Sequence, residues 1–161
     1  MKRWYVLAAG VFALDQATKE IAMRMLAEGF PVDVLPFLSW NLTFNTGAAF
    51  SLFEGLGVVI GVVAAAVSVY LIIEIWRLRE GWLEGAAYGL ILAGALGNLT
   101  DRLRHGQVVD FVHVQYDWFN FPVFNVADSA ITVGAAAWIW LLVMDARRGS
   151  GRSRNGPPGP R

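Results

Sequence analysis

Long apolar runs dominate the chain and predict helices that cross a membrane. Residues 124–144 and residues 55–73 are each apolar enough and long enough to span a bilayer as a helix. The run that begins at Trp4 follows two basic residues, and we interpret it as a retained first span, because no convincing cleavage site and polar domain follow it. The predicted spans cover about residues 4–26, 54–76, 82–101 and 124–145.

Small residues recur at every fourth position of the third predicted span. They are Gly85, Gly89, Ala93 and Gly97. A stripe of this kind lets helices approach closely in a membrane. We therefore predict a packing role for it, without chemistry.

Segments between the spans have the pattern of strands. Apolar and polar residues alternate over residues 37–45, which predicts a half-buried strand. Residues 107–116 are rich in β-branched side chains and residues 119–124 look extended, which predicts a hairpin or edge strand that joins the first strand on one side of the membrane. The small residues after Asn45, Gly47 among them, fit close backbone approach and a plain turn equally well.

Composition places the chain among integral membrane proteins. Hydrophobic residues make up 56% and charged residues 16%, and the mean hydropathy is +0.48, which does not describe an ordinary soluble domain. We predict a mainly α-helical, polytopic membrane protein with four transmembrane helices, a small extracytoplasmic β-sheet and one domain over residues 1–146. The net charge of +0 gives no sign of a nucleic-acid partner. The absence of Cys excludes a thiol nucleophile, a disulfide framework and a thiolate metal site.

The basic residues predict the orientation in the membrane. Most of them fall at the amino end, in the second loop and in the tail: Lys2, Arg3, Arg77, Arg79, Arg147, Arg148, Arg152, Arg154 and Arg161. By the positive-inside rule both termini are expected in the cytoplasm. Arg102 lies towards the opposite face of the membrane and is expected to pair with a nearby carboxylate. Residues 147–161 are expected to form a disordered tail with weak attraction to anionic lipid.

Two carboxyl groups occur in apolar surroundings that disfavour their ionisation. Asp128 lies near one end of the last span, where hydrocarbon penalises a charge by roughly 3 kcal/mol or more, and Asp110 lies in the apolar run at 108–111. We predict that they meet near the outer face. Two adjacent carboxyls share one proton, so the pair is an acid beside a base that can activate water against an amide and protonate the departing nitrogen. Three amides are able to orient them or a substrate: Asn45, Asn98 and Asn125.

Other charged residues have simpler interpretations. Asp15 and Lys19 stand four residues apart and share one helical face. They either form a buried pair that holds the first helix to its neighbours or take part directly in chemistry. Asp101 and Arg102 are interpreted as a charge pair at a helix end.

Competing functions explain less of the sequence. A serine protease could use Ser129 or Ser51 with Lys19 as base, but it would not need the carboxyl pair. A metalloprotease would want a His-rich site, whereas the chain has His105 and His113 and no H-E-x-x-H run. A small proton-coupled transporter that uses its intramembrane Asp residues is a non-enzymatic alternative, and a purely structural membrane subunit is another.

Several ordered blocks resemble the signature of the lipoprotein signal peptidase family, also called signal peptidase II. The blocks are residues 45–51, 94–102, 108–111 and 124–129. Asp15 and Lys19 match the family's first-helix motif, and the similarity extends from about Trp4 to Asp145. The region 115–121 and the tail after Asp145 carry no family signature.

The resemblance implies a bacterial inner-membrane aspartic endopeptidase that removes the signal peptide from prolipoproteins, cutting before a cysteine that bears a diacylglyceryl group. It implies Asp110 and Asp128 as the catalytic pair. Positions that shape the site or bind substrate are Asn45, Gly47, Asn98, Arg102, Asn125 and Ala127, and supporting positions are Asp15, Lys19 and Asp101. It further implies no metal or other cofactor, contact with membrane lipid, and inhibition by globomycin, which occupies the pair. We expect a monomer.

Overall fold

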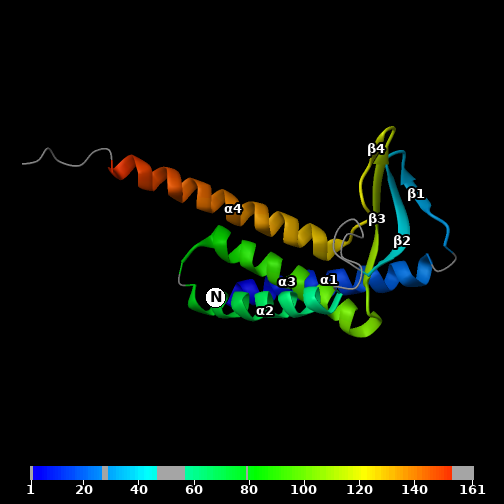
Figure 1. Ribbon diagram of the computed structural model, residues 1–161, viewed down its shortest axis with the longest axis horizontal. Helices are drawn as coiled ribbons and strands as arrows, with labels where there is room; N and C mark the ends of the chain where they lie inside the picture. Colours follow the sequence, from blue (N-terminus) through cyan, green and yellow to red (C-terminus); the bar gives the residue numbers. More distant parts are fainter. Residues whose placement is uncertain (1, 27–28, 47–56, 79, 154–161) are drawn as a thin grey trace, which may run out of the picture.

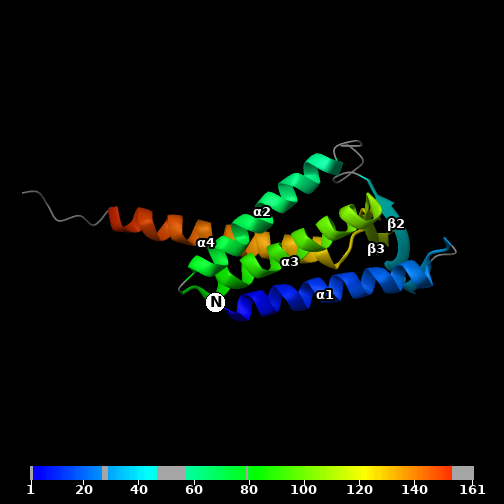
Figure 2. The ribbon, with the colours of Figure 1, turned by 90° about the horizontal axis from the view of Figure 1, so that it is seen from below.

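A computed structural model of the protein describes residues 2–26, 29–46, 57–78 and 80–153. Its helices are α1 (Lys2–Met25), α2 (Gly57–Arg77), α3 (Trp82–His105) and α4 (Val126–Ser153). Its strands are β1 (Val32–Leu35), β2 (Leu38–Asn45), β3 (Val108–Tyr116) and β4 (Phe119–Asn120). The predicted mainly helical architecture with a small antiparallel sheet is confirmed. The sheet stands across one end of the helices (Figures 1 and 2).

Helix α3 contacts each of the other three helices. Its small residues make this possible: a Cβ at Gly85 would collide with the ring of Trp4, and a Cβ at Gly89 would lie 3.0 Å from the Trp4 carbonyl oxygen. On the face towards α4, a Cβ at Gly94 would collide with the carbonyl oxygen of Ala127. The predicted packing role of the small-residue stripe is therefore confirmed.

Two of the described helices are apolar and long enough to cross a membrane by length and composition, Gly57–Arg77 and Val126–Arg148. Helices α1 and α3 are just as long but less apolar, because each carries charged residues. Three of these charges, on Asp15, Lys19 and Asp101, are buried inside the bundle. Much of the surface of α1 is apolar, with Val6, Leu14 and other large side chains exposed.

The end of α4 differs from the prediction. The fourth span was expected to end near residue 145 and the chain to be disordered from residue 147, yet the helix continues to Ser153. Arginine is a good helix former, and positive charge near a helix C-terminus is favourable to the helix dipole. Residues 154–161 lie outside the described part of the chain, as does the start of the second predicted span.

The sheet has the order β1-β2-β3-β4 with antiparallel neighbours. Strands β2 and β3 pair in a register that places Thr43 opposite Asp110, and β3 and β4 form a hairpin that turns at Asp117, which has a positive φ of 50°. This confirms the predicted hairpin and its union with the 38–44 strand. Strand β1 was missed: residues 32–35 are Val, Asp, Val and Leu, so alternation holds only over the first three of them.

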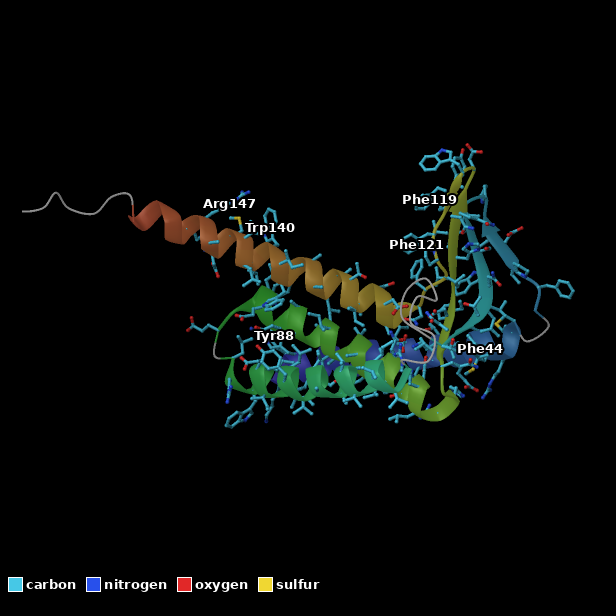
Figure 3. The ribbon with its side chains drawn as sticks, viewed as in Figure 1. Phe44, Tyr88, Phe119, Phe121, Trp140 and Arg147 are labelled. Carbon is cyan, nitrogen blue, oxygen red and sulfur yellow. The ribbon has the colours of Figure 1, made fainter. Side chains whose placement is uncertain are left out.

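The far end of the bundle contains the amino end of α1, the carboxyl end of α2 and the carboxyl end of α4 (Figure 1). These ends carry basic residues, including Arg3, Arg77 and Arg147; Arg147 lies far along α4 from the sheet (Figure 3). The fold therefore separates a basic end from a sheet-bearing end.

Candidate active site

The two carboxyl groups singled out in the sequence come together where the sheet meets the bundle. Asp110 lies in β3, and Asp128 lies in the first turn of α4. Both contact Asn125: its side-chain Nδ2 donates to Oδ1 of Asp110 at 2.7 Å, and its backbone N–H donates to Oδ2 of Asp128 at 3.3 Å. A single buried residue thus bridges the pair.

Helix α4 begins directly after Asn125, and its first turn fixes the position of Asp128. The Oδ1 atom of Asn125 accepts a hydrogen bond from the Asp128 backbone N–H at 2.8 Å, while the Asp128 carboxylate accepts the Asn125 backbone N–H in return. This reciprocal pattern is a capping box with Asp in the place that Glu often takes. The N–H of Ala127 donates to Oδ1 of Asp15 at 2.8 Å. The backbone N–H groups of the first helical turn have no partner within the helix, and their hydrogen bonds to Asn125 and Asp15 therefore hold the start of α4 in place.

The side chain of Asn98 has only one workable orientation. Its Oδ1 accepts hydrogen bonds from Nζ of Lys19 at 3.0 Å and from Nδ2 of Asn125 at 3.2 Å. An ammonium group can only donate, so the Asn98 oxygen must face Lys19. The Asn98 Nδ2 is then turned to Asp128, where it donates to Oδ1 at 2.8 Å.

Lys19 lies at the centre of a buried group that we call the salt-bridge cluster, formed by Asp15, Lys19 and Asp101. Its Nζ lies 2.9 Å from Oδ2 of Asp15 and 2.8 Å from Oδ2 of Asp101. Asp101 also accepts the backbone N–H of Val109, next to Asp110. The cluster thereby ties α1 to α3 and to β3. The buried-pair interpretation of Asp15 and Lys19 fits this geometry.

The predicted charge pair between Asp101 and Arg102 forms no salt bridge in the described part of the chain, although the charge of Asp101 still acts on Arg102 from a longer distance. Successive helical residues point in different directions, so Asp101 turns inward to Lys19 while Arg102 turns elsewhere. Nη1 of Arg102 donates to the Asn98 carbonyl oxygen at 3.2 Å, and within the described residues no ion pair joins Arg102 to a carboxylate. Arg102 lines a mostly apolar cavity of about 580 Å³ between α2 and α3.

One polar residue of this network was missed in the sequence. Gln16 donates from Nε2 to Oδ1 of Asp101 at 3.1 Å and to Oδ2 of Asp15 at 3.2 Å, so it bridges two members of the salt-bridge cluster. Its Oε1 accepts from Arg104 at 3.4 Å. The signal was its position beside Asp15, directly after the uncharged run from Trp4 to Leu14.

Asn45 completes the set of amides around the carboxyls. At the end of β2, its Nδ2 donates to Oδ2 of Asp110 at 3.2 Å. Gly47, the neighbouring position implied by the family resemblance, lies outside the described residues. Asn45, Asn98 and Asn125 therefore all present amide hydrogens to the carboxyl pair.

Asp110 lies in the sheet, outside the helices, and its ionisation is perturbed. Burial raises the pKa of Asp110 to about 6, and the charge of Asp128 acts in the same direction. Hydrogen bonds from Asn45 and Asn125 and the charge of Lys19 oppose the rise. Desolvation and a neighbouring like charge thus outweigh the donors, so this carboxyl keeps its proton to a higher pH than an exposed aspartate does.

The side chains that a serine protease or a metalloprotease would need form other contacts in this structure. The Oγ of Ser129 donates to the Asn125 carbonyl oxygen at 3.0 Å, and Lys19 is saturated by two carboxylates and one amide. Ser51 lies outside the described residues. His113 contacts Asn120 within the β3–β4 hairpin.

Fold and site together define a helical membrane protein with a buried, amide-bridged pair of carboxyls at one end of its bundle. The sequence matches the family model described as signal peptidase (SPase) II over residues 7–144. The chain belongs to this family, as its motifs suggested.

Individual relatives agree with this assignment. The chain is 45% identical to the lipoprotein signal peptidase of Teredinibacter turnerae over 143 residues, which cover 86% of this chain and 85% of that protein. It is 39% identical to the lipoprotein signal peptidase of Azoarcus sp. over an alignment of 171 positions, which covers 99% of this chain and 92% of that protein. A solved bacterial membrane enzyme superposes with a TM-score of 0.78 at 28% identity, covering 100% of this chain and 96% of that one. Another superposes with a TM-score of 0.77 at 31% identity, covering 90% and 95%.

Proposed function

We propose that this protein is an aspartic endopeptidase of the membrane that removes signal peptides from lipoproteins, with Asp110 and Asp128 as its catalytic residues. One observation carries the catalytic assignment: two carboxyl groups from separate elements converge on Asn125 and receive hydrogen bonds from neutral amides. No ion pair involves either carboxyl within the described part of the chain. The transporter alternative is not favoured, because the family is one of peptidases.

Hydrolysis by such a pair requires one ionised and one protonated carboxyl. The ionised group takes a proton from water as the water oxygen attacks the scissile carbonyl carbon, and the protonated group gives its proton to the carbonyl oxygen. In the second step the carboxyl that gained a proton delivers it to the amide nitrogen as the C–N bond breaks. The hydroxyl proton of the intermediate returns to the other carboxylate, which restores the starting state.

The three amides suit this cycle because they are neutral. A cation in direct contact with either carboxyl would favour its ionised form and weaken the acid that the leaving nitrogen needs. Amide donors instead fix the position of each oxygen with a smaller effect on its ionisation. Asn98 is itself oriented by Lys19, so the salt-bridge cluster supports the pair without touching it.

The apolar cavity between α2 and α3 supports a lipid-bearing substrate. It is lined by Thr46, next to Asn45, by Arg102, and by apolar residues of both helices such as Val62 and Leu99. An acyl chain could enter it sideways from the bilayer while the peptide reaches the carboxyl pair. We therefore propose the diacylglyceryl-modified prolipoprotein as substrate, with cleavage before the modified cysteine and competition by globomycin.

We further propose four membrane spans, formed by α1 to α4 in a bacterial inner membrane. Hydropathy alone marks α2 and α4, but the charges that lower it in α1 and α3 include the buried salt-bridge cluster, which faces protein and not lipid. The basic far end of the bundle supports cytoplasmic termini, and in that orientation the sheet and the carboxyl pair would lie at the extracytoplasmic face. The peptidase domain would end near residue 146, and the tail would begin as a continuation of α4.

A direct test compares two precursor peptides that differ only in the diacylglyceryl group on the cysteine. Purified protein in detergent should cleave the modified peptide before its cysteine and leave the unmodified one intact. Addition of a chelator should not change the rate. Loss of activity with chelator would contradict the two-carboxyl mechanism, and equal cleavage of both peptides would contradict lipid recognition.

A further inference from the structure

The hairpin formed by β3 and β4 carries large aromatic side chains that the protein leaves uncovered. Trp118 is 87% exposed, Tyr116 is 66% exposed, and Phe119 and Phe121 are 45% and 47% exposed. This segment lies in the region of the sequence without a family signature, and the proposed catalytic chemistry does not use it. Aromatic area of this size in water is costly unless something covers it.

The hairpin is amphipathic across its two faces. Tyr116 pairs with Phe119, and paired residues project from the same face of a sheet. Phe121 follows Phe119 by two residues and shares that face. The opposite face carries Gln115, which pairs with Asn120. One face is therefore aromatic and the other polar.

The aromatic residues form a continuous row towards the site. The ring of Phe119 stacks against Phe121 with centroids 6.3 Å apart, and Phe121 meets Phe124 edge-to-face at 5.6 Å. Trp118 adds an edge-to-face contact with Phe119 at 6.3 Å. Phe124 directly precedes Asn125 and is held to β3 through backbone bonds with Val112. We call Trp118, Phe119, Phe121 and Phe124 the aromatic row.

The direction in which the aromatic face of the hairpin points indicates which surroundings could cover it. Figure 3 shows Phe119 and Phe121 on the side of the sheet that looks back along α4, the side on which Trp140 and Arg147 lie farther away. Helix α4 is apolar enough over Val126–Arg148 to cross a membrane, and it exposes Val133, Ile139 and Trp140. If α4 crosses the bilayer, as proposed above, the sheet lies over the membrane surface and its aromatic face meets the outer leaflet.

We propose that the β3–β4 hairpin is a membrane anchor, with Tyr116, Trp118, Phe119 and Phe121 seated in the interfacial region of the outer leaflet. Trp and Tyr favour this region because their rings are apolar and their N–H or O–H group stays hydrated. The polar face with Gln115 and Asn120 remains in water. Through the aromatic row the anchor holds Asn125, and hence the carboxyl pair, at a fixed depth relative to the lipid on the substrate.

Single-cysteine variants test the proposal, because the chain has no cysteine of its own. Phe119→Cys and Asn120→Cys place an environment-sensitive nitrobenzoxadiazole label on adjacent residues of opposite faces. In vesicles of phosphatidylethanolamine and phosphatidylglycerol, the label at 119 should emit at shorter wavelength and be quenched by brominated lipid. The label at 120 should emit as in water and be quenched by iodide. Phe121→Cys is a second lipid-facing variant, in case the first fails to fold.

Identical emission and quenching at the two positions would overturn the proposal. Shielding at 119 that appears only after a precursor peptide is added would also overturn it, since the face would then bind substrate. The experiment is repeated with Asp128→Asn in the same chain, where shielding should persist. Failure of the catalytic proposal would instead appear as cleavage that survives Asp128→Asn, so the two failures are distinguishable.

Discussion

Two groups of aspartates lie side by side in this protein and differ in their partners. In the salt-bridge cluster, Asp15 and Asp101 share the ammonium group of Lys19. In the proposed catalytic pair, Asp110 and Asp128 receive hydrogen bonds from amides, and in the part of the chain that the structure describes no ammonium group contacts either of them directly. Asn98 connects the two groups, because it accepts from Lys19 and donates to Asp128. The comparison teaches that a directly bound cation, and not burial alone, separates the aspartates of the salt-bridge cluster from the two that we propose to be catalytic.

The largest expected effect is on cleavage when a member of the pair is neutralised. Asp128→Asn or Asp110→Asn should lower the rate of prolipoprotein cleavage by roughly 10²- to 10⁴-fold or more, because the acid–base cycle loses one of its two groups. Asp33→Asn, at an exposed carboxyl on β1, is the matched control and should retain the wild-type rate. A variant of the pair that unfolds more easily but cleaves normally would show that these carboxyls are structural.

Breaking the salt-bridge cluster should act mainly on stability. Lys19→Met leaves two buried carboxylates without a counter-charge, which should lower the free energy of unfolding by about 3–5 kcal/mol. Unfolding in detergent measures the change. Arg24→Met removes an exposed ion pair with Glu20 on the same helix and should change stability by less than about 1 kcal/mol. Similar losses in both variants would contradict a special role for the buried cation.

Crowding the same cluster should have a smaller effect. A Cβ at Gly97 would lie 2.5 Å from Oδ2 of Asp15, so Gly97→Ala must displace that carboxylate and should cost about 1–3 kcal/mol in unfolding. Gly10→Ala is the control, because a Cβ there meets nothing within 4 Å and alanine favours a helix by up to about 1 kcal/mol. If both variants are equally stable, the close approach of α1 and α3 is not tight at this point.

The smallest expected effect is a shift in the pH dependence of cleavage. Burial raises the pKa of Asp110 to about 6, so activity that requires a proton on the carboxyl pair should fall as the pH rises beyond about that value. The hydrogen bond from Asn45 lowers this pKa by favouring the charged form. Asn45→Ala should therefore move the decline to higher pH, as measured by kcat/KM across a pH series. A decline that moves to lower pH would contradict the assigned contact.

Local pattern was sufficient to predict much of this fold. Alternation located β2, β-branched content located β3, and long apolar runs located α2 and most of α4. Strand β1 was not predicted, because residues 32–35 are too few to show a clear strand pattern between apolar neighbours. The carboxyl-terminal end of α4 was predicted too early, because Gly and Ser residues usually end a helix. This helix continues to Ser153.

The partners of the polar residues could be predicted only in part. Asp15 and Lys19 lie one turn apart on a helix, so their pairing follows from spacing. The contact between Lys19 and Asp101 joins two helices that are distant in sequence. Adjacency in the sequence instead suggested Arg102 as the partner of Asp101. Gln16 was missed for the same reason, since its partners become neighbours only when α1 packs against α3.

The sequence by itself determined that the chain enters a membrane, that it forms long helices with a few strands, and that aspartates occur where ionisation is costly, because these properties depend on side-chain chemistry and local spacing. Tertiary structure alone decided which aspartates receive a cation and which receive amides. The physical reason is that electrostatic partners act over a few ångströms of space, and in this protein those distances are set by how α1, α3, α4 and the sheet pack together.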